Sequence, residues 1–439
     1  MSGSRVDWTS SPSSALHGEV VVPGDKSISH RAIMLAAIAE GSSRITGFLE
    51  GGDTLATARA FSLMGVDIES PRDNERVVHG VGLYGLHRPD APIDCGNAGT
   101  GMRLLMGLLA GQRFDSTLIG DESLSLRPMR RVIEPLSRMN ARIDSNNGLP
   151  PLRVRGSQTL SGIRYEVPIA SAQVKSAILL AGLYARGETE VIEPHPTRDY
   201  TESMLSAFGF PIEFSEGRAK IVGGHRLRAV DVDVPADFSS AAFFIVAATI
   251  VSGSELTIKN VGLNPRRTGL LPVLRLMGAN IVETNSRVVG GERVGDLFVR
   301  SASLRGIEVP IEHVPDMIDE FPILFVAAAV AQGATRVTGA AELRVKESDR
   351  IAVMAAGLQK LGITIEETPD GAVIRGGKLT DGNVTSAGDH RCAMSFAVAG
   401  LVCDDAVAIV DCANVGTSFP DFLALANSVG FAMADANRT

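Results

Sequence analysis

The chain has 439 residues, which at roughly 150 residues per domain corresponds to two or three domains. Hydrophobic residues make up 45% and charged residues 21% of the sequence, which excludes a disordered chain. The formal net charge of −8 argues against broad binding to nucleic acid or membrane surfaces, because both require a basic face. A small anionic substrate in a locally positive pocket remains compatible with this charge.

The sequence predicts no signal peptide and no membrane span. No apolar segment follows the early positive charge at Arg5, and the longest apolar runs, 241–251 and 321–331, have about half the length that a span needs. The cysteines lack Cys-x-x-Cys and zinc-site spacing, so we expect buried thiols in a reducing cytoplasm. They are Cys95, Cys392, Cys403 and Cys412.

One sequence pattern recurs six times along the chain: an apolar helical stretch, then a glycine or asparagine, then a short β-like run. Glycine or asparagine at this point is typical of a helix that ends in the left-handed conformation and leads into a strand. The six residues recur at intervals of about 70 residues and are Gly65, Asn140, Gly209, Gly278, Gly362 and Gly430.

An Ala/Leu-rich helix and a short strand precede each copy of this pattern. The predicted helices span 32–39, 102–110, 174–184, 240–251, 322–331 and 393–402. The predicted strands span 43–46, 116–119, 189–192, 255–258, 335–338 and 406–409. Each unit therefore reads β-α-β-α-β-β.

A single unit of this kind cannot bury both its sheet and its helices, whereas three units packed together can. The sequence therefore predicts an α/β protein with two domains of three repeats each. Residues 24–235 form the first predicted domain, and residues 1–23 with 236–439 form the second. We expect the active site in the cleft between the two domains.

Polar turns lie directly before the predicted inner helices, where unpaired N–H groups favour anions. We expect Asp237 and Ser239 to be N-caps. Capping explains Lys26 and Arg31 less well, because a cation at a helix N-terminus opposes the helix dipole. The Asn97–Thr100 loop is either a plain tight turn or a place where the backbone approaches a ligand closely.

The stretch from Leu343 to Arg350 is the most informative. Lys346 and Arg350 are four residues apart, and like charges at this spacing on one helix repel unless an anion lies between them. Glu347 beside them suits proton transfer. The alternative is a surface helix in which Glu347 and Asp349 compensate the two cations.

Further arginines and acids follow other repeats. Arg127, Arg198 and Arg267 lie in later polar loops, as surface residues or as ligands for phosphate or carboxylate. Asp319 and Glu320 precede an apolar helix, as capping residues or as a catalytic acid or base. No histidine or acidic cluster has metal-ligand spacing, so we expect no metal site. These residues indicate an enzyme that closes on a multiply anionic small molecule, with a non-catalytic phosphometabolite-binding protein as the alternative.

Taken together, these motifs resemble the 5-enolpyruvylshikimate-3-phosphate (EPSP) synthase family from about residue 17 to residue 433. The motifs that carry the resemblance are long and occur in the family's order. They are 23–31 (PGDKSISHR), 96–100 (GNAGT), Arg127-Pro128, Ser171-Ala172-Gln173, 344–350 (RVKESDR) and 389–391 (DHR).

The resemblance implies transfer of enolpyruvyl from phosphoenolpyruvate to the 5-hydroxyl of shikimate 3-phosphate, with release of phosphate, on the route to chorismate and aromatic amino acids. It also implies a two-domain inside-out α/β barrel that is cofactor-free and monomeric. By motif, the residues implied for shikimate 3-phosphate are Lys26, Ser27, Arg31, Ser171, Ala172, Gln173, Arg198, Asp319 and Lys346. Those implied for phosphoenolpyruvate are Lys26, Asn97, Gly99, Thr100, Arg127, Gln173, Arg350 and Arg391.

The resemblance also implies the catalytic groups. Asp319 is the implied base at the ring hydroxyls, with Asp316 as the lower-ranked choice. Glu347 is implied to protonate the methylene carbon of phosphoenolpyruvate, while Lys346 assists at the attacked hydroxyl and Lys26 touches both substrates. These groups would handle the two protons of the reaction.

Two motifs depart from many family members: Ser-Ala-Gln stands at 171–173, and no lysine precedes the loop 416–420. Both features resemble a subgroup that often tolerates glyphosate, yet Gly99 is the residue of sensitive members. Two rivals share the repeat fold. The sister enzyme that uses a UDP-sugar should carry a reactive cysteine, for which Cys95 is the candidate. An RNA-terminal phosphate cyclase would need a catalytic histidine.

Overall fold

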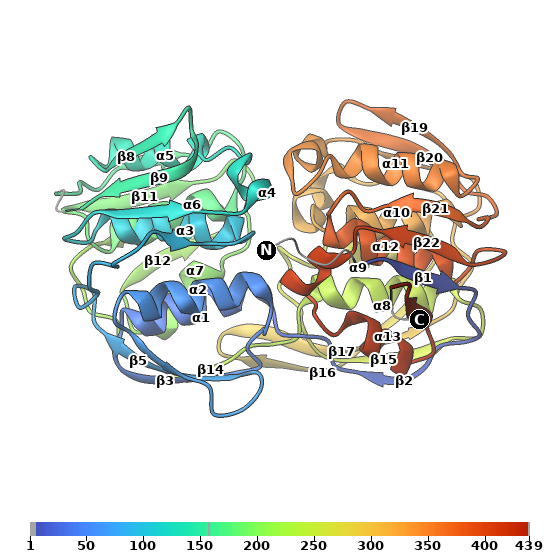
Figure 1. The fold of residues 1–439 in the computed structure, drawn as a ribbon, viewed down its shortest axis with the longest axis horizontal. Coiled ribbons are helices and arrows are strands. Elements are labelled where there is room, and N and C mark those ends of the chain that lie inside the picture. The colour runs from blue at the N-terminus through green and yellow to red at the C-terminus, as the bar shows by residue number, and fades with distance from the viewer. Residues whose placement is uncertain (1–5, 157–158, 438–439) are drawn as a thin grey trace. The chain divides into compact units, whose positions relative to one another are not determined.

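The computed structural model describes residues 6–156 and 159–437, in two compact units (Figure 1). Unit 2 contains Gly24–Val234 together with Val289–Glu292. Unit 1 contains the N-terminal segment up to Pro23, the segment Pro235–Val288, and the C-terminal part from Arg293. The first five residues, which carry part of the signal-peptide prediction, lie outside the described residues.

Unit 2 contains three four-stranded sheets of one kind. In each, two parallel strands are followed by two antiparallel ones. The first sheet has the order β14 (Val232–Asp233), β3 (Glu40–Thr46), β5 (Glu75–Val81) and β4 (Asp67–Glu69). The second has β6 (Ile93–Asp94), β7 (Ser116–Ile119), β9 (Leu149–Arg155) and β8 (Arg142–Asn146). The third has β10 (Arg164–Glu166), β11 (Glu188–Ile192), β13 (Arg218–Val222) and β12 (Ile212–Ser215).

Unit 1 also contains three sheets. One has the order β16 (Asn280–Val289), β17 (Glu292–Arg300), β15 (Glu255–Gly262) and β2 (His17–Val20). Another has β21 (Gly382–Thr385), β22 (Val407–Val410), β1 (Trp8–Ser11) and β23 (Ala432–Asp435). The third has only β18 (Ala334–Val337), β20 (Gly371–Arg375) and β19 (Thr364–Thr368), and single parallel bridges at Arg305 and Glu308 extend it.

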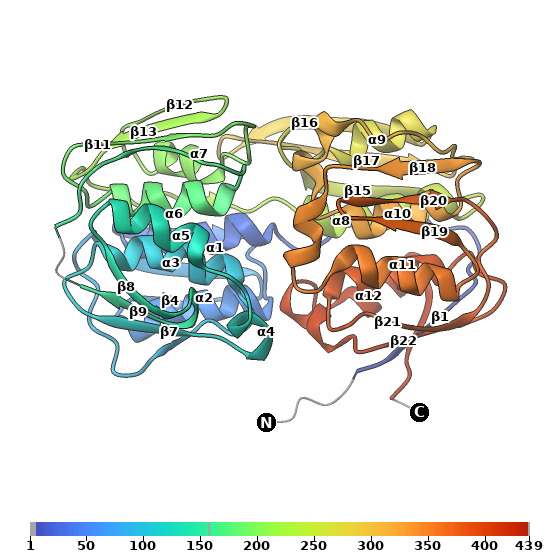
Figure 2. The ribbon, with the colours of Figure 1, turned by 90° about the horizontal axis from the view of Figure 1, so that it is seen from above.

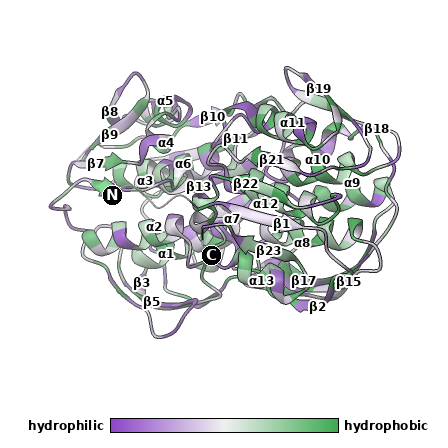
Figure 3. Ribbon diagram, turned by 45° about the vertical axis from the view of Figure 1, so that its right-hand side comes forward, coloured by the Kyte–Doolittle hydropathy of each residue, from purple (hydrophilic) through white to green (hydrophobic). Residues whose placement is uncertain are grey.

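Each unit buries three helices that its sheets surround (Figure 2). These helices are α1 (Lys26–Ala37), α3 (Gly99–Ala110) and α6 (Ala172–Gly182) in unit 2, and α8 (Phe238–Ile250), α10 (Phe321–Ala329) and α12 (His390–Gly400) in unit 1. Every residue of α10 and α12 is buried, which explains their apolar composition, because a helix that packs on all sides needs no polar stripe. In Figure 3, α3 and α8 are mostly green (hydrophobic), whereas the edge strands β8 and β19 carry purple.

Six further helices complete the two units. They are α2 (Gly52–Leu63), α5 (Arg130–Arg138), α7 (Tyr200–Ala207), α9 (Leu270–Met277), α11 (Arg350–Lys360) and α13 (Phe422–Ser428). The six glycine or asparagine residues of the recurring pattern lie one or two residues after the ends of these helices, and all six have positive φ, from 71° at Asn140 to 108° at Gly430. The prediction of left-handed helix ends that lead into strands is therefore confirmed.

The predicted inner helices and strands exist, but the helices begin earlier than the apolar pattern suggests. For example, α1 begins at Lys26 rather than at residue 32, so the polar turn is its first turn. The remaining short elements are α4 (Glu122–Ser125) and the 3-10 turns η1 (Ile311–His313), η2 (Pro315–Met317), η3 (Ala341–Val345) and η4 (Ala413–Thr417). Among the described residues, none of the helices reaches the length and apolar character that crossing a membrane requires.

Candidate active site

Unit 2 places Lys26 and Arg31 on the first two turns of α1. Asp25 caps this helix, since its carboxylate accepts a hydrogen bond from the Ile28 amide at 2.8 Å. Lys26 Nζ lies 3.1 Å from Asp53 Oδ2, and 17% of the lysine side chain is exposed. The start of α1 therefore has both a cap and a cation, because Asp25 caps the helix and Lys26 carries the charge.

Arg31 is buried and is held on three sides. Its guanidinium donates to Thr201 Oγ1 at 2.7 Å, to Ser176 Oγ at 2.8 Å and to the Ser27 carbonyl at 2.9 Å. Burial and then the nearby Arg198 guanidinium lower the pKa of Arg31 to about 10. Because two like charges repel, this pair of arginines is suited to binding an anion.

The loop that carries Arg198 rests on a buried ion pair. Lys175 Nζ lies 2.7 Å from Glu193 Oε2 and 2.8 Å from Glu202 Oε1, and it also donates to the Thr197 carbonyl at 3.3 Å. Burial opposes the charge on Lys175, but the two carboxylates raise its pKa above the usual value, so the ammonium stays charged. The sequence pattern gave no sign of Lys175, because its partners are remote in the chain.

A second group joins the starts of α3 and α6. Gln173 Nε2 donates to Thr100 Oγ1 at 2.8 Å, and Gln173 Oε1 accepts from Arg103 Nη1 at 2.8 Å. Ser171 caps α6 through the Val174 amide at 3.5 Å, and Ala172, at 9% exposure, is the helix's first residue. Arg103 was not predicted; its position one turn after Gly99 is the signal that points to it.

Arg127 closes the Asn97–Thr100 loop. Its Nη2 donates to Asn97 Oδ1 at 2.6 Å and to Ser123 Oγ at 3.1 Å. A Cβ added at Gly99 would lie 3.1 Å from Arg127 Nη1 and 3.2 Å from Arg103 Nη1. A side chain at position 99 would therefore displace these guanidinium groups slightly from the helix start. No side chain caps α3.

Unit 1 gathers cations around Asp319, which lies between η2 and α10. Asp319 Oδ2 accepts from Arg267 Nη1 at 3.0 Å, whereas Asp319 Oδ1 lies 3.4 Å from Arg350 Nη1 and 4.0 Å from Lys346 Nζ. Arg391 donates to the Asp319 backbone carbonyl at 3.2 Å. The carboxylate thus faces three basic side chains from different parts of the sequence, and a fourth binds the backbone of the same residue.

Arg350 connects this carboxylate to Glu347 and Asp389. Its Nη2 lies 2.6 Å from Glu347 Oε2, and its Nε lies 2.8 Å from Asp389 Oδ2. Burial opposes the charge on Arg350, but Asp389 and then Glu347 and Asp319 raise its pKa above the usual value. Asp389 also caps α12 through the Arg391 amide at 2.9 Å.

The expectation that Lys346 and Arg350 share a helix is wrong. Lys346 follows the 3-10 turn η3, and α11 begins only at Arg350. Each cation has an acidic partner of its own, because Lys346 Nζ lies 2.8 Å from Glu342 Oε1 and Arg350 pairs with Glu347. The backbone at 346–349 is not helical, and from this segment and the start of α11 both side chains approach Asp319.

The capping prediction is confirmed for Asp237 and wrong for Ser239. Asp237 accepts from the Ser239 amide at 2.8 Å and caps α8. The Ser239 hydroxyl donates instead to Glu320. Burial raises the pKa of Glu320, against the effect of Arg267 and Arg391, so this acid belongs to the buried support of Asp319.

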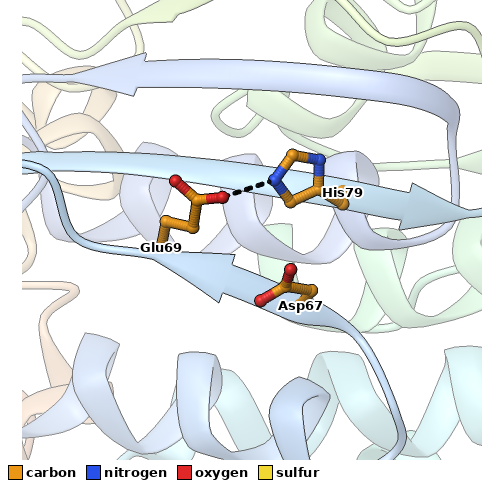
Figure 4. Close-up of side chains that lie close together, drawn as sticks. All are labelled: Asp67, Glu69 and His79. Carbon is orange, nitrogen blue, oxygen red and sulfur yellow. Dashed lines mark hydrogen bonds and ion pairs between the residues drawn. The ribbon is translucent and has the colours of Figure 1, made fainter.

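One group of metal-ligand side chains occurs among the described residues, on an outer face of unit 2 (Figure 4). Asp67 on β4 faces His79 on β5, and Glu69 Oε1 lies 3.0 Å from His79 Nε2. Asp67 and Glu69 are exposed, and the hydrogen bond between Glu69 and His79 explains the arrangement without a metal. Sequence spacing did not reveal the group, because strand pairing creates it.

The predicted thiols are confirmed, since all four cysteines are free and buried. Burial, and then the neighbouring Asp94, raise the pKa of Cys95 to about 12. The thiolate is the nucleophilic form of cysteine, so this buried environment disfavours the reactive cysteine that the UDP-sugar rival needs. His30 is likewise buried, and burial followed by Lys26 and Arg31 lowers its pKa to about 3.

Comparison with known proteins gives one consistent result. The family model for EPSP synthase (3-phosphoshikimate 1-carboxyvinyltransferase) matches residues 10–425. A 3-phosphoshikimate 1-carboxyvinyltransferase of Xanthomonas campestris pv. campestris (strain B100) is 62% identical over 435 residues, which is 99% of each chain. The protein of the same name from Xanthomonas euvesicatoria pv. vesicatoria (strain 85-10) is 62% identical over 439 residues, with both chains fully covered.

Solved structures agree with these relatives. An EPSP synthase from Acinetobacter baumannii superposes with a TM-score of 0.88 at 50% sequence identity, covering 98% of this chain and 99% of the other. A second structure of an EPSP synthase from the same organism gives a TM-score of 0.88 at 48% identity. The match spans every motif discussed above, and the chain therefore belongs to the EPSP synthase family of 3-phosphoshikimate 1-carboxyvinyltransferases.

Proposed function

We propose that the two units serve one reaction, the transfer of enolpyruvyl from phosphoenolpyruvate to the 5-hydroxyl of shikimate 3-phosphate. The observation that carries this proposal is the group around Asp319, where an acceptor for a proton lies within 4.0 Å of Lys346 and Arg350. Two anionic substrates and a proton transfer need this combination of cations and carboxylates. Unit 2 supplies further cations, and unit 1 supplies the acid–base groups.

In unit 2, the residues proposed to hold shikimate 3-phosphate are Lys26, Ser27, Arg31, Ser171, Ala172, Gln173 and Arg198, with Asp319 and Lys346 contributed by unit 1. The proximity of Arg31 and Arg198 supports this assignment, because an anion between them relieves their repulsion. The proposed ligands of phosphoenolpyruvate are Lys26, Asn97, Gly99, Thr100, Arg127 and Gln173, with Arg350 and Arg391 from unit 1. The guanidinium of Arg127 against the open start of α3 supports this second set.

The proposed chemistry moves two protons. Asp319 accepts the proton of the 5-hydroxyl, with Lys346 beside it, as the hydroxyl oxygen attacks C2 of phosphoenolpyruvate. Glu347 delivers a proton to C3, which gives a tetrahedral intermediate. The bond from C2 to the phosphate oxygen then breaks with its electron pair on the phosphate, which takes up the proton that the hydroxyl lost. The proton at C3 returns to Glu347, so that an enol ether and phosphate result. Arginines that neutralise the phosphate stabilise its departure.

The ion pairs within unit 1 support this division of roles. Glu347 is bonded to Arg350, and Arg350 also faces Asp319, so one guanidinium links the proposed acid and the proposed base. Asp316 suits the base less well, because its Oδ2 lies 3.6 Å from Arg266 Nη1, whereas Asp319 Oδ1 faces both Lys346 and Arg350.

The finer architecture is also a proposal. We propose that the six sheets and their buried helices are six βαβαββ repeats, three in each of two inside-out α/β barrels, and that residues 24–235 and residues 1–23 with 236–439 are the functional domains. The similar strand order of the sheets and the six left-handed helix ends support this reading. We also propose a monomer that works in the cytoplasm, where its free cysteines stay reduced; sedimentation of the purified protein tests the monomer.

A coupled phosphate-release assay tests the reaction. Phosphate should appear from phosphoenolpyruvate only when shikimate 3-phosphate is present, in equal amount to the enol ether product. Matched controls omit the acceptor or replace it with a UDP-sugar. Phosphate release that is equal without shikimate 3-phosphate, or that depends on the UDP-sugar, would overturn the proposal. Binding of both metabolites without turnover would point to a phosphometabolite-binding protein.

A further inference from the structure

Arg267 is a buried cation that contacts three carboxylates of unit 1. Its side chain is 5% exposed and lies in the segment before α9. Its Nη1 is 3.0 Å from Asp319 Oδ2 and 3.9 Å from Glu320 Oε1, while its Nη2 is 3.4 Å from Asp237 Oδ1. One guanidinium thus connects the start of α8, the start of α10 and the proposed catalytic base.

The two oxygens of Asp319 have different surroundings. Oδ2 is engaged by Arg267, whereas Oδ1 is turned toward Lys346 and Arg350 at 4.0 Å and 3.4 Å. A carboxylate held by one oxygen has little freedom to rotate, so its other oxygen keeps a fixed direction. This is the arrangement that a general base needs to meet a hydroxyl proton.

Burial separates Arg267 from the groups that reach solvent. The side chains of Asp319 and Lys346 are 15% and 20% exposed, compared with 5% for Arg267. A substrate can therefore approach Asp319 and Lys346 more readily than Arg267. The influence of Arg267 on the reaction must act through the carboxylate that it holds.

We propose that Arg267 is a positioning residue for proton transfer: it fixes Asp319 through Oδ2, favours its ionised form, and directs Oδ1 to the acceptor hydroxyl. This inference rests on the proposed function, in which Asp319 is the base. It goes beyond it because the proposed function assigns Arg267 to neither substrate. The Ser239 hydroxyl and the Arg391 guanidinium hold Glu320 in turn, so the support behind Asp319 is continuous.

The charged groups around Asp319 set the sign of the expected pH effect. Arg267 comes from the segment before α9, Lys346 from the segment after η3, Arg350 from α11 and Arg391 from α12. The neighbouring acids are Glu320, Asp237, Glu347 and Asp316, each of them near an arginine. Removing the cation of Arg267 leaves a negative surplus, which raises the pKa of the Asp319 carboxyl.

The test compares Arg267→Gln, Arg267→Lys and wild type in the phosphate-release assay. Loss of one charge-assisted contact should lower kcat about 10- to 100-fold. KM for both substrates should stay within about threefold, because the proposal assigns Arg267 to neither substrate. The acid limb of the profile of kcat/KM against pH should move upward by about one unit.

Arg267→Lys, which keeps the charge, should recover part of kcat. Arg300→Gln, which breaks an exposed pair with Glu255 in the same unit, is the matched control.

A double-mutant cycle with Asp319→Asn separates positioning from general structural support. In the Asp319→Asn background, where Asp319 can no longer act as a base, adding Arg267→Gln should lower kcat by less than about threefold. An equal loss in both backgrounds, a normal kcat in Arg267→Gln, or an unshifted acid limb would overturn the inference. If Arg267→Gln does not fold, the same cycle is run with Arg267→Lys. If wild type itself lacks acceptor-dependent phosphate release, the proposed function fails instead.

Discussion

Gln173 and Thr100 join two buried helices of unit 2: the amide Nε2 on the first turn of α6 donates to the hydroxyl on the first turn of α3 at 2.8 Å. The other end of the same amide accepts from Arg103 Nη1 at 2.8 Å. The amide of Gln173 therefore donates through Nε2 and accepts through Oε1 at the same time.

Gln173→Glu should weaken the binding of both substrates without unfolding unit 2. The new charge keeps the contact with Arg103 but repels two anionic metabolites, so we expect KM for each to rise about tenfold, or about 1.4 kcal/mol. Steady-state kinetics measure this change. Gln359→Glu, at an exposed glutamine of unit 1 whose side chain donates to the Ile365 carbonyl, is the control. Unchanged KM values for both substrates would remove Gln173 from the proposed site.

Gly99→Ala should selectively weaken the binding of phosphoenolpyruvate. The added methyl group would lie 3.1 Å from Arg127 Nη1 and 3.2 Å from Arg103 Nη1, so the proposed phosphate ligand must move. We expect KM for phosphoenolpyruvate to rise about 10-fold or more, from the displacement of one charge-assisted hydrogen bond. KM for shikimate 3-phosphate should change less.

Gly377→Ala is the matched control for this substitution, because its Cβ would meet only Ile363 Cδ1 at 3.6 Å. Equal effects on the two KM values in Gly99→Ala would show that the methyl group disturbs unit 2 as a whole. That result would contradict the assignment of the Asn97–Thr100 loop to phosphoenolpyruvate.

Lys346→Met should reduce both substrate saturation and turnover. Lys346 Nζ lies 4.0 Å from Asp319 Oδ1 and 2.8 Å from Glu342 Oε1, and methionine keeps most of its length without the charge. We expect kcat to fall about 10²-fold or more, as is typical when a group that assists proton transfer is lost. KM for shikimate 3-phosphate should rise as well. Lys360→Met, at an exposed position of α11, controls for loss of charge; normal saturation curves in Lys346→Met count against its role.

Local patterns predicted the frame of the fold well. Each left-handed helix end, from Gly65 to Gly430, could be placed because glycine and asparagine adopt positive φ at little cost. The buried helices were predicted because an apolar run without a polar stripe has to be covered on all sides. The helix starts were placed too late, since the polar first turn of α1 contains Lys26 and Arg31.

The site was only partly predictable, because long-range partners decide the role of a charged side chain. Lys346 and Arg350 read as one helix from their spacing, yet Glu342 and Asp319 hold them on separate segments. Arg267 reads as a surface or phosphate-binding arginine, whereas it is buried against acids that lie far away in the sequence. Lys175 stands in an apolar helix with nothing nearby in the sequence to reveal its two buried glutamates.

Cys95→Ala should leave turnover within about threefold of wild type. Burial, and then Asp94, raise the pKa of the Cys95 thiol to about 12, so very little thiolate exists near neutral pH. Iodoacetamide at pH 8 should accordingly leave the native enzyme active, while all four thiols react after denaturation. Rapid inactivation that phosphoenolpyruvate prevents, together with loss of activity in Cys95→Ala, would instead support a reactive cysteine of the UDP-sugar type.

His30 should make unit 2 sensitive to acid. Burial, Lys26 and Arg31 lower its pKa from 6.5 to about 3, so the folded state binds fewer protons than the unfolded state between these two values. The free energy of unfolding therefore falls as pH drops below 6.5, by about 1.4 kcal/mol per pH unit, or about 2 kcal/mol by pH 5. Urea unfolding at pH 7 and pH 5 measures the loss.

His30→Gln should flatten this dependence, even if its stability at pH 7 is lower because the contact of His30 Nδ1 with Thr57 Oγ1 at 2.8 Å is changed. The relevant quantity is the difference in slope between variant and wild type, since other acid-sensitive groups are common to both. His225→Gln, at an exposed position of unit 2, should keep the slope of wild type. If His30→Gln and wild type lose the same free energy between pH 7 and pH 5, then His30 is protonated in the folded protein, and the cations beside it do not exclude a further positive charge.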